Sequence, residues 1–89
     1  MKEIILSGRV QGVFCRHYCS QNAKKLGIRG SATNLSDGSV RVIVDCEGEL
    51  LHKYLSHLRD NPYGIRFWGK ITDIQVNDFK GNPGGDYEF

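Results

Sequence analysis

Hydrophobic and polar positions alternate with a period of two in several stretches of the chain. The clearest case is 40–46, where valines and a cysteine alternate with other residues, and 71–79 has a weaker version of the pattern. Residues 3–10 form a short β-rich run, and 29–34 form a shorter, weakly patterned one. Because this period is typical of half-buried strands, we expect four strands here and a short edge strand at 86–89.

Two other stretches have the period of an amphipathic helix. In 14–26 apolar residues recur three and four positions apart, as at Cys15 and Cys19, and Gly27 supplies a natural stop. Leucines and a tyrosine at the same spacing predict a second helix over 50–58.

The predicted order is strand, helix, strand, strand, helix, strand, with a fifth strand at the end. This order predicts an α+β fold, a ferredoxin-like split βαβ sandwich, as a single domain over residues 1–89. Its antiparallel sheet has four to five strands, with two helices on one face. A right-handed crossover makes 3–10 and 29–34 parallel, with 40–46 between them, and Asp-Gly in 35–39 forms a hairpin turn. The carboxyl ends of the first two strands therefore share one sheet edge with the start of the first helix.

Composition narrows the class of function. The 89 residues carry 12 basic and 10 acidic side chains, a net charge of +2, and these charges are mixed along the chain. Nucleic acid is therefore not an expected partner, and an anionic small ligand is mildly favoured. No stretch has the length of a membrane span, and the N-terminal segment is too interrupted for a signal peptide. We expect a cytoplasmic monomer without membrane contact, whose three cysteines stay reduced.

Residues 8–17, GRVQGVFCRH, join the first strand to the first helix at the shared edge. Gly12 allows a positive φ and a close approach by a ligand, and the amides of 13–16 are free at the start of the helix. Arg16 lies in the first turn of the predicted helix, where a positive charge interacts unfavourably with the helix dipole. Its presence there indicates that it binds phosphate or carboxylate. Asn34 adds a neutral amide, so the pattern predicts an anion site. The simpler alternative is that Gly12 only makes a turn and Asn34 only shapes the hairpin.

Two other groups of residues have an ordinary structural explanation. Cys15, His17 and Cys19 could suggest a metal site, but the spacing of the two thiols puts them on the apolar face of the helix. We therefore expect core thiols and no metal. The aromatic pair Phe67 and Trp68 is expected at a corner of the core rather than in a recognition patch.

Two segments resemble the signatures of a known family. GRVQGVFCR at 8–16 closely resembles the Gly-x-Val-Gln-Gly-Val-x-Phe-Arg signature of the acylphosphatases. GSATNLSDGSV at 30–40 resembles their Gly-aromatic-x-x-Asn-x-x-x-Gly-x-Val signature. The two signatures occur in the family's order and at a similar separation, on a compatible predicted fold.

The resemblance implies an enzyme that hydrolyses the carboxyl–phosphate bond of small acyl phosphates to carboxylate and inorganic phosphate, with no metal or other cofactor. Arg16 matches the family's phosphate-binding arginine, and Asn34 matches the asparagine that orients the attacking water. The loop whose amides cradle the phosphate corresponds to Gln11, Gly12, Val13, Phe14 and Cys15.

The chain departs from the family pattern at Cys15, where phenylalanine is usual, and at Ser31, where an aromatic residue is usual. A serine at this position is expected to loosen the strand that carries Asn34. An alternative function is therefore a catalytically weak module that binds acyl phosphate or phosphate on the same fold. A ferredoxin-like nucleic-acid binder is disfavoured, because 3–10 and 40–46 carry no aromatic residue.

Overall fold

The computed structural model describes all residues from 1 to 89. The elements follow one another as β1 (Lys2–Arg9), α1 (Cys15–Lys25), β2 (Gly30–Asn34), β3 (Val40–Val44), α2 (Gly48–Asp60), β4 (Lys70–Asp78) and β5 (Tyr87–Glu88). Every element that the sequence predicts is present, with ends that differ by one or two residues from the predicted ones.

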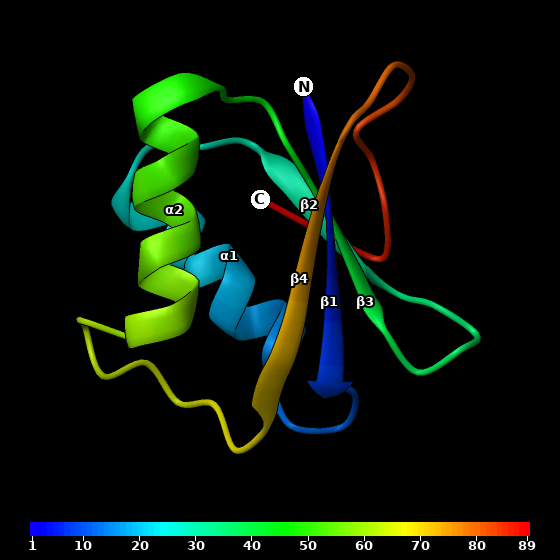
Figure 1. The fold of residues 1–89 in the computed structure, drawn as a ribbon, viewed down its shortest axis with the longest axis vertical. Helices are drawn as coiled ribbons and strands as arrows, with labels where there is room; N and C mark the ends of the chain where they lie inside the picture. The colour runs from blue at the N-terminus through cyan, green and yellow to red at the C-terminus, as the bar shows by residue number, and fades with distance from the viewer.

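The sheet has five strands in the order β4-β1-β3-β2-β5, and all neighbouring strands are antiparallel. Because β1 and β2 both pair antiparallel with β3, they run parallel to each other, as the right-handed crossover predicts. Both helices lie on the same side of this sheet (Figure 1). The ferredoxin-like sandwich predicted from the sequence is confirmed.

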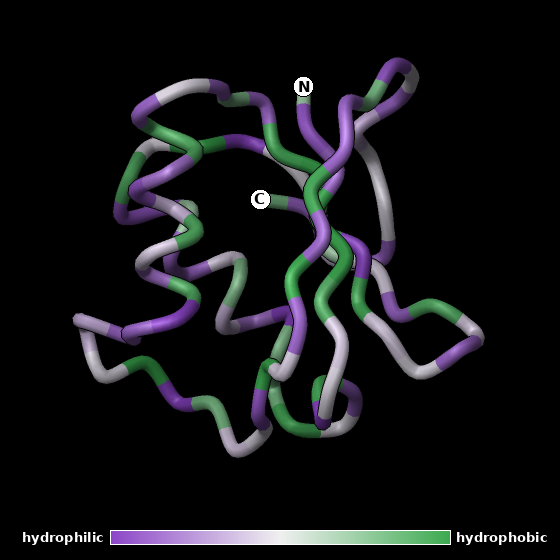
Figure 2. The backbone as a smooth tube through the Cα atoms, in the orientation of Figure 1, coloured by the Kyte–Doolittle hydropathy of each residue, from purple (hydrophilic) through white to green (hydrophobic).

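The core lies between the two helices and the face of the sheet that they cover. Alternate residues of β1 and β3 point into it, such as Ile4, Leu6 and Val42, all fully buried. The alternation of hydrophobic and hydrophilic positions is visible along β4 in Figure 2. Cys15 and Cys19 lie in the same core with their Sγ atoms 4.0 Å apart, which confirms that they are core thiols.

Two tyrosines tie the helices to each other. Tyr18 of α1 donates its hydroxyl hydrogen bond to the carbonyls of His57 and Leu58 in α2, with oxygens 3.0 and 2.7 Å apart. Tyr54 of α2 donates in turn to the carbonyl of Cys19 in α1, at 2.9 Å. Both rings are buried, so each hydroxyl needs such a partner, and the pair holds the helices in one relative position.

Burial also raises the pKa of Tyr18 to about 12, since a charged phenolate is poorly solvated between the helices. A tyrosine in the unfolded chain has a pKa near 10. The stability that neutral Tyr18 contributes is therefore complete below about pH 10 and is lost as the pH rises toward 12. We expect the free energy of unfolding, measured in urea, to fall by roughly 2–3 kcal/mol over this range.

Tyr18→Phe is the matched variant for this alkaline loss. It should be less stable than the wild type at pH 8, because it lacks both hydrogen bonds, and its stability should fall less steeply above pH 10. Burial raises the pKa of Tyr54 as well, so part of the fall remains. An alkaline fall of unchanged size in Tyr18→Phe would contradict this assignment.

No helix of the structure combines the length and the apolar character needed to cross a membrane.

Candidate active site

The carboxyl ends of β1 and β2 meet at one edge of the sheet, as predicted. Leu6 of β1 and Asn34 of β2 both pair with Val40 of β3, so they lie at the same level on either side of it. The loop that follows β1, with Gly12 at its centre, therefore starts beside the residue that ends β2. Figure 1 shows this loop in blue at the lower end of the sheet.

The β1–α1 loop has an unusual backbone. Gly12 has a φ of 73° and Phe14 a φ of 67°, both in the left-handed region, and Val13 between them is outside it. Alternation of this kind turns successive N–H groups toward one concave point, which favours an anion. For phenylalanine the left-handed conformation costs roughly 1–3 kcal/mol, and such strain is concentrated at functional sites.

Helix α1 begins in the same loop without the usual caps. Its N-cap residue Phe14 makes no side-chain hydrogen bond, and its first turn contains no acidic residue. The amide of Tyr18 is bonded to the carbonyl of Phe14, so the amides of the first turn before it have no acceptor within the helix. These free N–H groups and the positive end of the helix dipole are available to an external anion.

A cavity of about 290 Å³ opens at this point, and we name it the phosphate cavity. It is lined by Val10, Gly12, Phe14, Cys15, Arg16, His17, Asn34 and Tyr87. The structure thus brings Arg16 and Asn34 together with three members of the predicted loop. Gln11 and Val13 do not line the cavity.

Gln11 and Val13 instead hold the loop in place. The side-chain nitrogen of Gln11 donates to the carbonyls of Leu35 and Ser39, at 2.7 and 2.9 Å, and so ties the loop to the hairpin turn that follows Asn34. The carbonyl of Val13 accepts a hydrogen bond from the amide of Trp68 at 3.2 Å. Phosphate binding by the amides of Gln11 and Val13 stays a prediction.

Asn34 has a free acceptor inside the molecule. Its Oδ1 atom is buried and has no hydrogen-bond partner. A buried polar atom without a partner is costly to stability, so such atoms are rare and call for a functional explanation. Asn34 itself lines the phosphate cavity, beside Arg16 and the loop around Gly12.

The C-terminal segment, which follows β4, packs along β2 beside the phosphate cavity. Ser31 donates to the carbonyl of Pro83, and the Asp86 amide donates to the hydroxyl of Thr33 at 3.2 Å. A side chain at Gly85 would collide with the hydroxyls of Ser31 and Thr33. The small side chain of Ser31 thus lets the C-terminal segment pack and pair there, and the expectation that a serine at this position loosens β2 stays a prediction.

This segment also brings charge and aromatic groups that sequence reasoning missed. The Asp86 carboxylate lies 3.8 Å from the Arg16 guanidinium, in an ion pair that is partly exposed. The Tyr87 hydroxyl lies 3.2 Å from Nδ1 of His17. His17 could have been found from its place beside Arg16 in the first signature. Nothing in the sequence pattern links Asp86 or Tyr87 to a loop some 70 residues earlier.

The aromatic pair of the α2–β4 loop is divided between core and surface. Phe67 stacks on buried Tyr18, with ring centroids 4.6 Å apart. Trp68 is 62% exposed. Its ring is in edge contact with the ring of Phe14, with centroids 5.2 Å apart. The expected core position is correct for Phe67 and wrong for Trp68.

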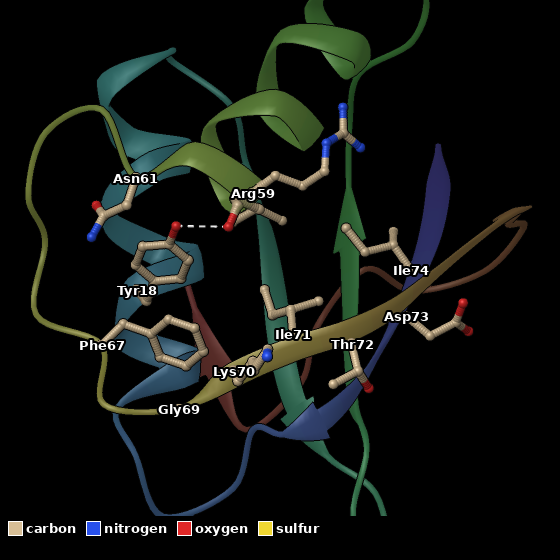
Figure 3. Close-up of a pocket in the computed structure, with 11 residues that line it drawn as sticks. Tyr18, Arg59, Asn61, Phe67, Gly69, Lys70, Ile71, Thr72, Asp73 and Ile74 are labelled. Carbon is tan, nitrogen blue, oxygen red and sulfur yellow. Dashed lines mark hydrogen bonds between the residues drawn. The ribbon is translucent and has the colours of Figure 1, made fainter.

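The largest cavity of the molecule, about 610 Å³, lies elsewhere. Figure 3 shows it between the end of α2 and β4, with Tyr18 and Phe67 on one side and Ile71 and Ile74 along the strand. No helix begins at this cavity, and neither of the predicted catalytic residues lines it. Both predicted catalytic residues, Arg16 and Asn34, line the smaller phosphate cavity instead.

No group of three or more histidine, cysteine, aspartate or glutamate side chains lies in an arrangement that could hold a metal ion. The polar groups that converge on the phosphate cavity are a guanidinium, amides and an amide oxygen, which bind oxyanions and water.

Comparison with known proteins identifies the family of the chain. The family profile described as Acylphosphatase matches residues 2–88. The chain is 43% identical to an acylphosphatase of Deinococcus radiodurans over 86% of each chain. It is 41% identical to one of Thermus thermophilus over 80% of this chain and 88% of the relative.

A further relative and a solved structure agree. An acylphosphatase of Methanococcoides burtonii is 42% identical over 67% of this chain, a match that spans 62% of the relative. The crystal structure of acylphosphatase from Bacillus subtilis superposes with a TM-score of 0.76, at 26% identity over 97% of this chain and 91% of that one. By its sequence over almost its whole length and by its fold, the chain belongs to the acylphosphatase family.

Proposed function

We propose that the chain hydrolyses the carboxyl–phosphate bond of small acyl phosphates in the phosphate cavity. Arg16 and the free amides around Gly12 hold the phosphoryl group, and Asn34 holds the attacking water. The observation that carries the proposal is that Arg16, Asn34 and an uncapped helix start lie around one cavity. An oxyanion and a water molecule are the two ligands that this set fits.

The reaction needs little more than these groups. The water oxygen forms a bond to phosphorus, the bond between phosphorus and the acyl oxygen breaks, and the carboxylate leaves with the electron pair. A carboxylate is a good leaving group, so no general acid is required. The proton lost by the water goes to an oxygen of the substrate, because Asn34 can orient a water molecule but cannot act as a base.

Electrostatic stabilisation and positioning supply the catalysis. Charge on the equatorial oxygens of the phosphoryl group is met by amides and a guanidinium that are already in place. Asn34 restricts the water to one direction of attack. Less entropy is then lost in reaching the transition state, which lowers the activation free energy. We further propose that the chain works in the cytoplasm as a monomer, with no metal ion, nucleic acid or membrane as partner.

The test is hydrolysis of acetyl phosphate and benzoyl phosphate at neutral pH in the presence of EDTA. We expect release of inorganic phosphate and the carboxylate in equal amounts. The control substrate is p-nitrophenyl phosphate, a phosphate monoester with a less activated bond, which should be turned over far more slowly. A folded protein that binds phosphate without turnover would instead support the alternative, a catalytically weak binding module.

Asp86 supplies a prediction about phosphate affinity. Its carboxylate lies 3.8 Å from the guanidinium that we assign to the phosphate, so the two anions compete for Arg16. A partly exposed ion pair contributes little free energy, so the effect of removing it should be small. We expect Asp86→Asn to lower the inhibition constant of inorganic phosphate by about two- to fivefold. The measurement is inhibition of acetyl phosphate hydrolysis at low ionic strength.

Asp73→Asn is the matched control for this change. Asp73 is an exposed carboxylate of β4 that lines the largest cavity and not the phosphate cavity. It changes the net charge equally and should leave phosphate inhibition unchanged. An equal effect of both variants would mean that overall charge, and not the pair with Arg16, sets the affinity.

A further inference from the structure

The phosphate cavity continues outward into a shallower groove of about 490 Å³. This groove, which we name the acyl groove, is lined by Phe14, His17, Arg66 and Tyr87. Phe14, His17 and Tyr87 also line the phosphate cavity, whereas Arg66 lines the acyl groove alone. A ligand held at the phosphate cavity therefore has direct access to the groove.

The two spaces differ in the chemistry of their linings. Arg16 and Asn34 line only the inner one, which suits a phosphoryl group and water. The outer one has two aromatic rings, an imidazole and a single formal charge, that of Arg66.

A large aromatic side chain stands exposed beside the acyl groove. Trp68 is 62% and Phe14 48% exposed, and the two rings are in edge contact. The Arg66 guanidinium lies 5.5 Å from the centre of the Trp68 ring, within cation–π range. Adjacent exposed aromatic groups of this size are unusual on a soluble protein unless they bind something.

The backbone holds these side chains against the phosphate loop. The Trp68 amide donates to Val13 at 3.2 Å, and the Arg9 guanidinium donates to the Trp68 carbonyl at 2.6 Å. The position of Trp68 is therefore set by the fold, although its side chain makes little contact with the core. Figure 1 shows the yellow α2–β4 loop at the same end of the molecule as the blue β1–α1 loop.

From these observations we infer that the acyl groove is a binding site for the acyl group of the substrate, and that it favours an aromatic acyl group with an anionic substituent at its far end. The aromatic ring packs against Phe14 and Tyr87, and the distal anion pairs with Arg66. This inference rests on the proposed hydrolysis and extends it to the class of substrate.

The test compares acetyl, benzoyl and 4-carboxybenzoyl phosphate in the wild type and in Arg66→Gln. Each variant is compared with the wild type on the same substrate, because the three leaving groups differ in intrinsic reactivity. We expect Arg66→Gln to lower kcat/KM for 4-carboxybenzoyl phosphate by about three- to tenfold and to leave acetyl phosphate unchanged. Benzoyl phosphate should change less than the carboxylated substrate.

Arg59→Gln is the matched control, since Arg59 is an exposed arginine that lines the largest cavity and not the acyl groove. It should leave all three substrates unchanged. Selective loss of 4-carboxybenzoyl phosphate turnover in Arg59→Gln would overturn the inference and move the acyl group to the largest cavity. Equal loss on all three substrates in Arg66→Gln would overturn it as well.

Trp68 provides a second measurement that does not depend on turnover. It is the only tryptophan of the chain and its ring contacts Phe14 and Arg66, two residues that line the acyl groove, so its fluorescence reports on the immediate neighbourhood of the groove. Titration with the non-hydrolysed analogue 4-carboxybenzoylphosphonate should change its emission, and Arg66→Gln should weaken this binding by about three- to tenfold. Acetylphosphonate should produce a smaller change.

The two measurements separate the inference from the proposed function. A wild type that does not hydrolyse acetyl phosphate contradicts the proposed function. The titration alone then tests whether the acyl groove binds the aromatic acyl group. A wild type that hydrolyses acetyl phosphate, with Trp68 emission unaffected by the aromatic phosphonate, overturns the inference and leaves the function standing.

Discussion

Arg16→Ala is expected to lower kcat/KM for acetyl phosphate by about a thousandfold or more, the range found when an arginine is removed from a phosphoryl-transfer site. Arg16 is the only arginine or lysine among the residues that line the phosphate cavity. Without it, charge that gathers on the phosphoryl oxygens is met by amides alone. The measurement is steady-state hydrolysis of acetyl phosphate, with phosphate inhibition as the readout of binding.

The fold should survive this change. The pair between Arg16 and Asp86 is partly exposed, so its loss should alter the free energy of unfolding by less than about 1 kcal/mol. Arg16→Lys keeps the charge but loses the planar fork of donors, and we expect intermediate activity. Arg29→Ala, which removes an exposed arginine outside the phosphate cavity, is the control and should be fully active. Arg16→Ala with near wild-type activity would rule out the assigned role.

Asn34→Ala is expected to lower kcat by about a hundred- to a thousandfold while inorganic phosphate still binds. Asn34 contributes the only side-chain amide to the lining of the phosphate cavity, and alanine leaves the water without a fixed direction. Arg16 and the loop amides remain, so the inhibition constant of phosphate should change little. This separation of kcat from binding distinguishes Asn34 from Arg16.

The stability of the Asn34→Ala variant provides a second test of the role of Asn34. Removing a buried polar atom that has no partner relieves an unfavourable desolvation, so Asn34→Ala should be as stable as the wild type or more stable in urea. Asn77→Ala, at an exposed asparagine of β4, is the control and should keep full activity. If Asn34→Ala lost activity and stability together, the residue would only shape the hairpin, which was the simpler alternative.

Much of the fold follows from local patterns. The periods of two and of three to four residues placed every strand and helix, with ends within one or two residues. The handedness of the crossover then made the first two strands parallel with the third between them, which brought Asn34 to the same edge as the loop around Gly12. The glycine, the free amides and Arg16 are neighbours in the chain, so their meeting in one cavity needed no long-range contact.

The sequence misjudged residues whose surroundings come from distant parts of the chain. The sequence did not show that the C-terminal segment packs on the small side chain of Ser31 and pairs with β2. Phe67 and Trp68 are adjacent large aromatic residues. Only the positions of Tyr18 and Phe14 decide that one ring lies against the core and the other at the surface.

By itself, then, the sequence determined the elements, their order and the phosphate loop with Arg16 and Asn34, because periodicity and short motifs are properties of neighbouring residues. Tertiary structure alone decided that Asp86 faces Arg16, that Tyr87 meets His17, and that the acyl groove opens beside them. These contacts join the first helix to the last residues of the chain. Contacts between residues so far apart leave no periodic trace in a sequence, and only the folded sheet and helices bring them together.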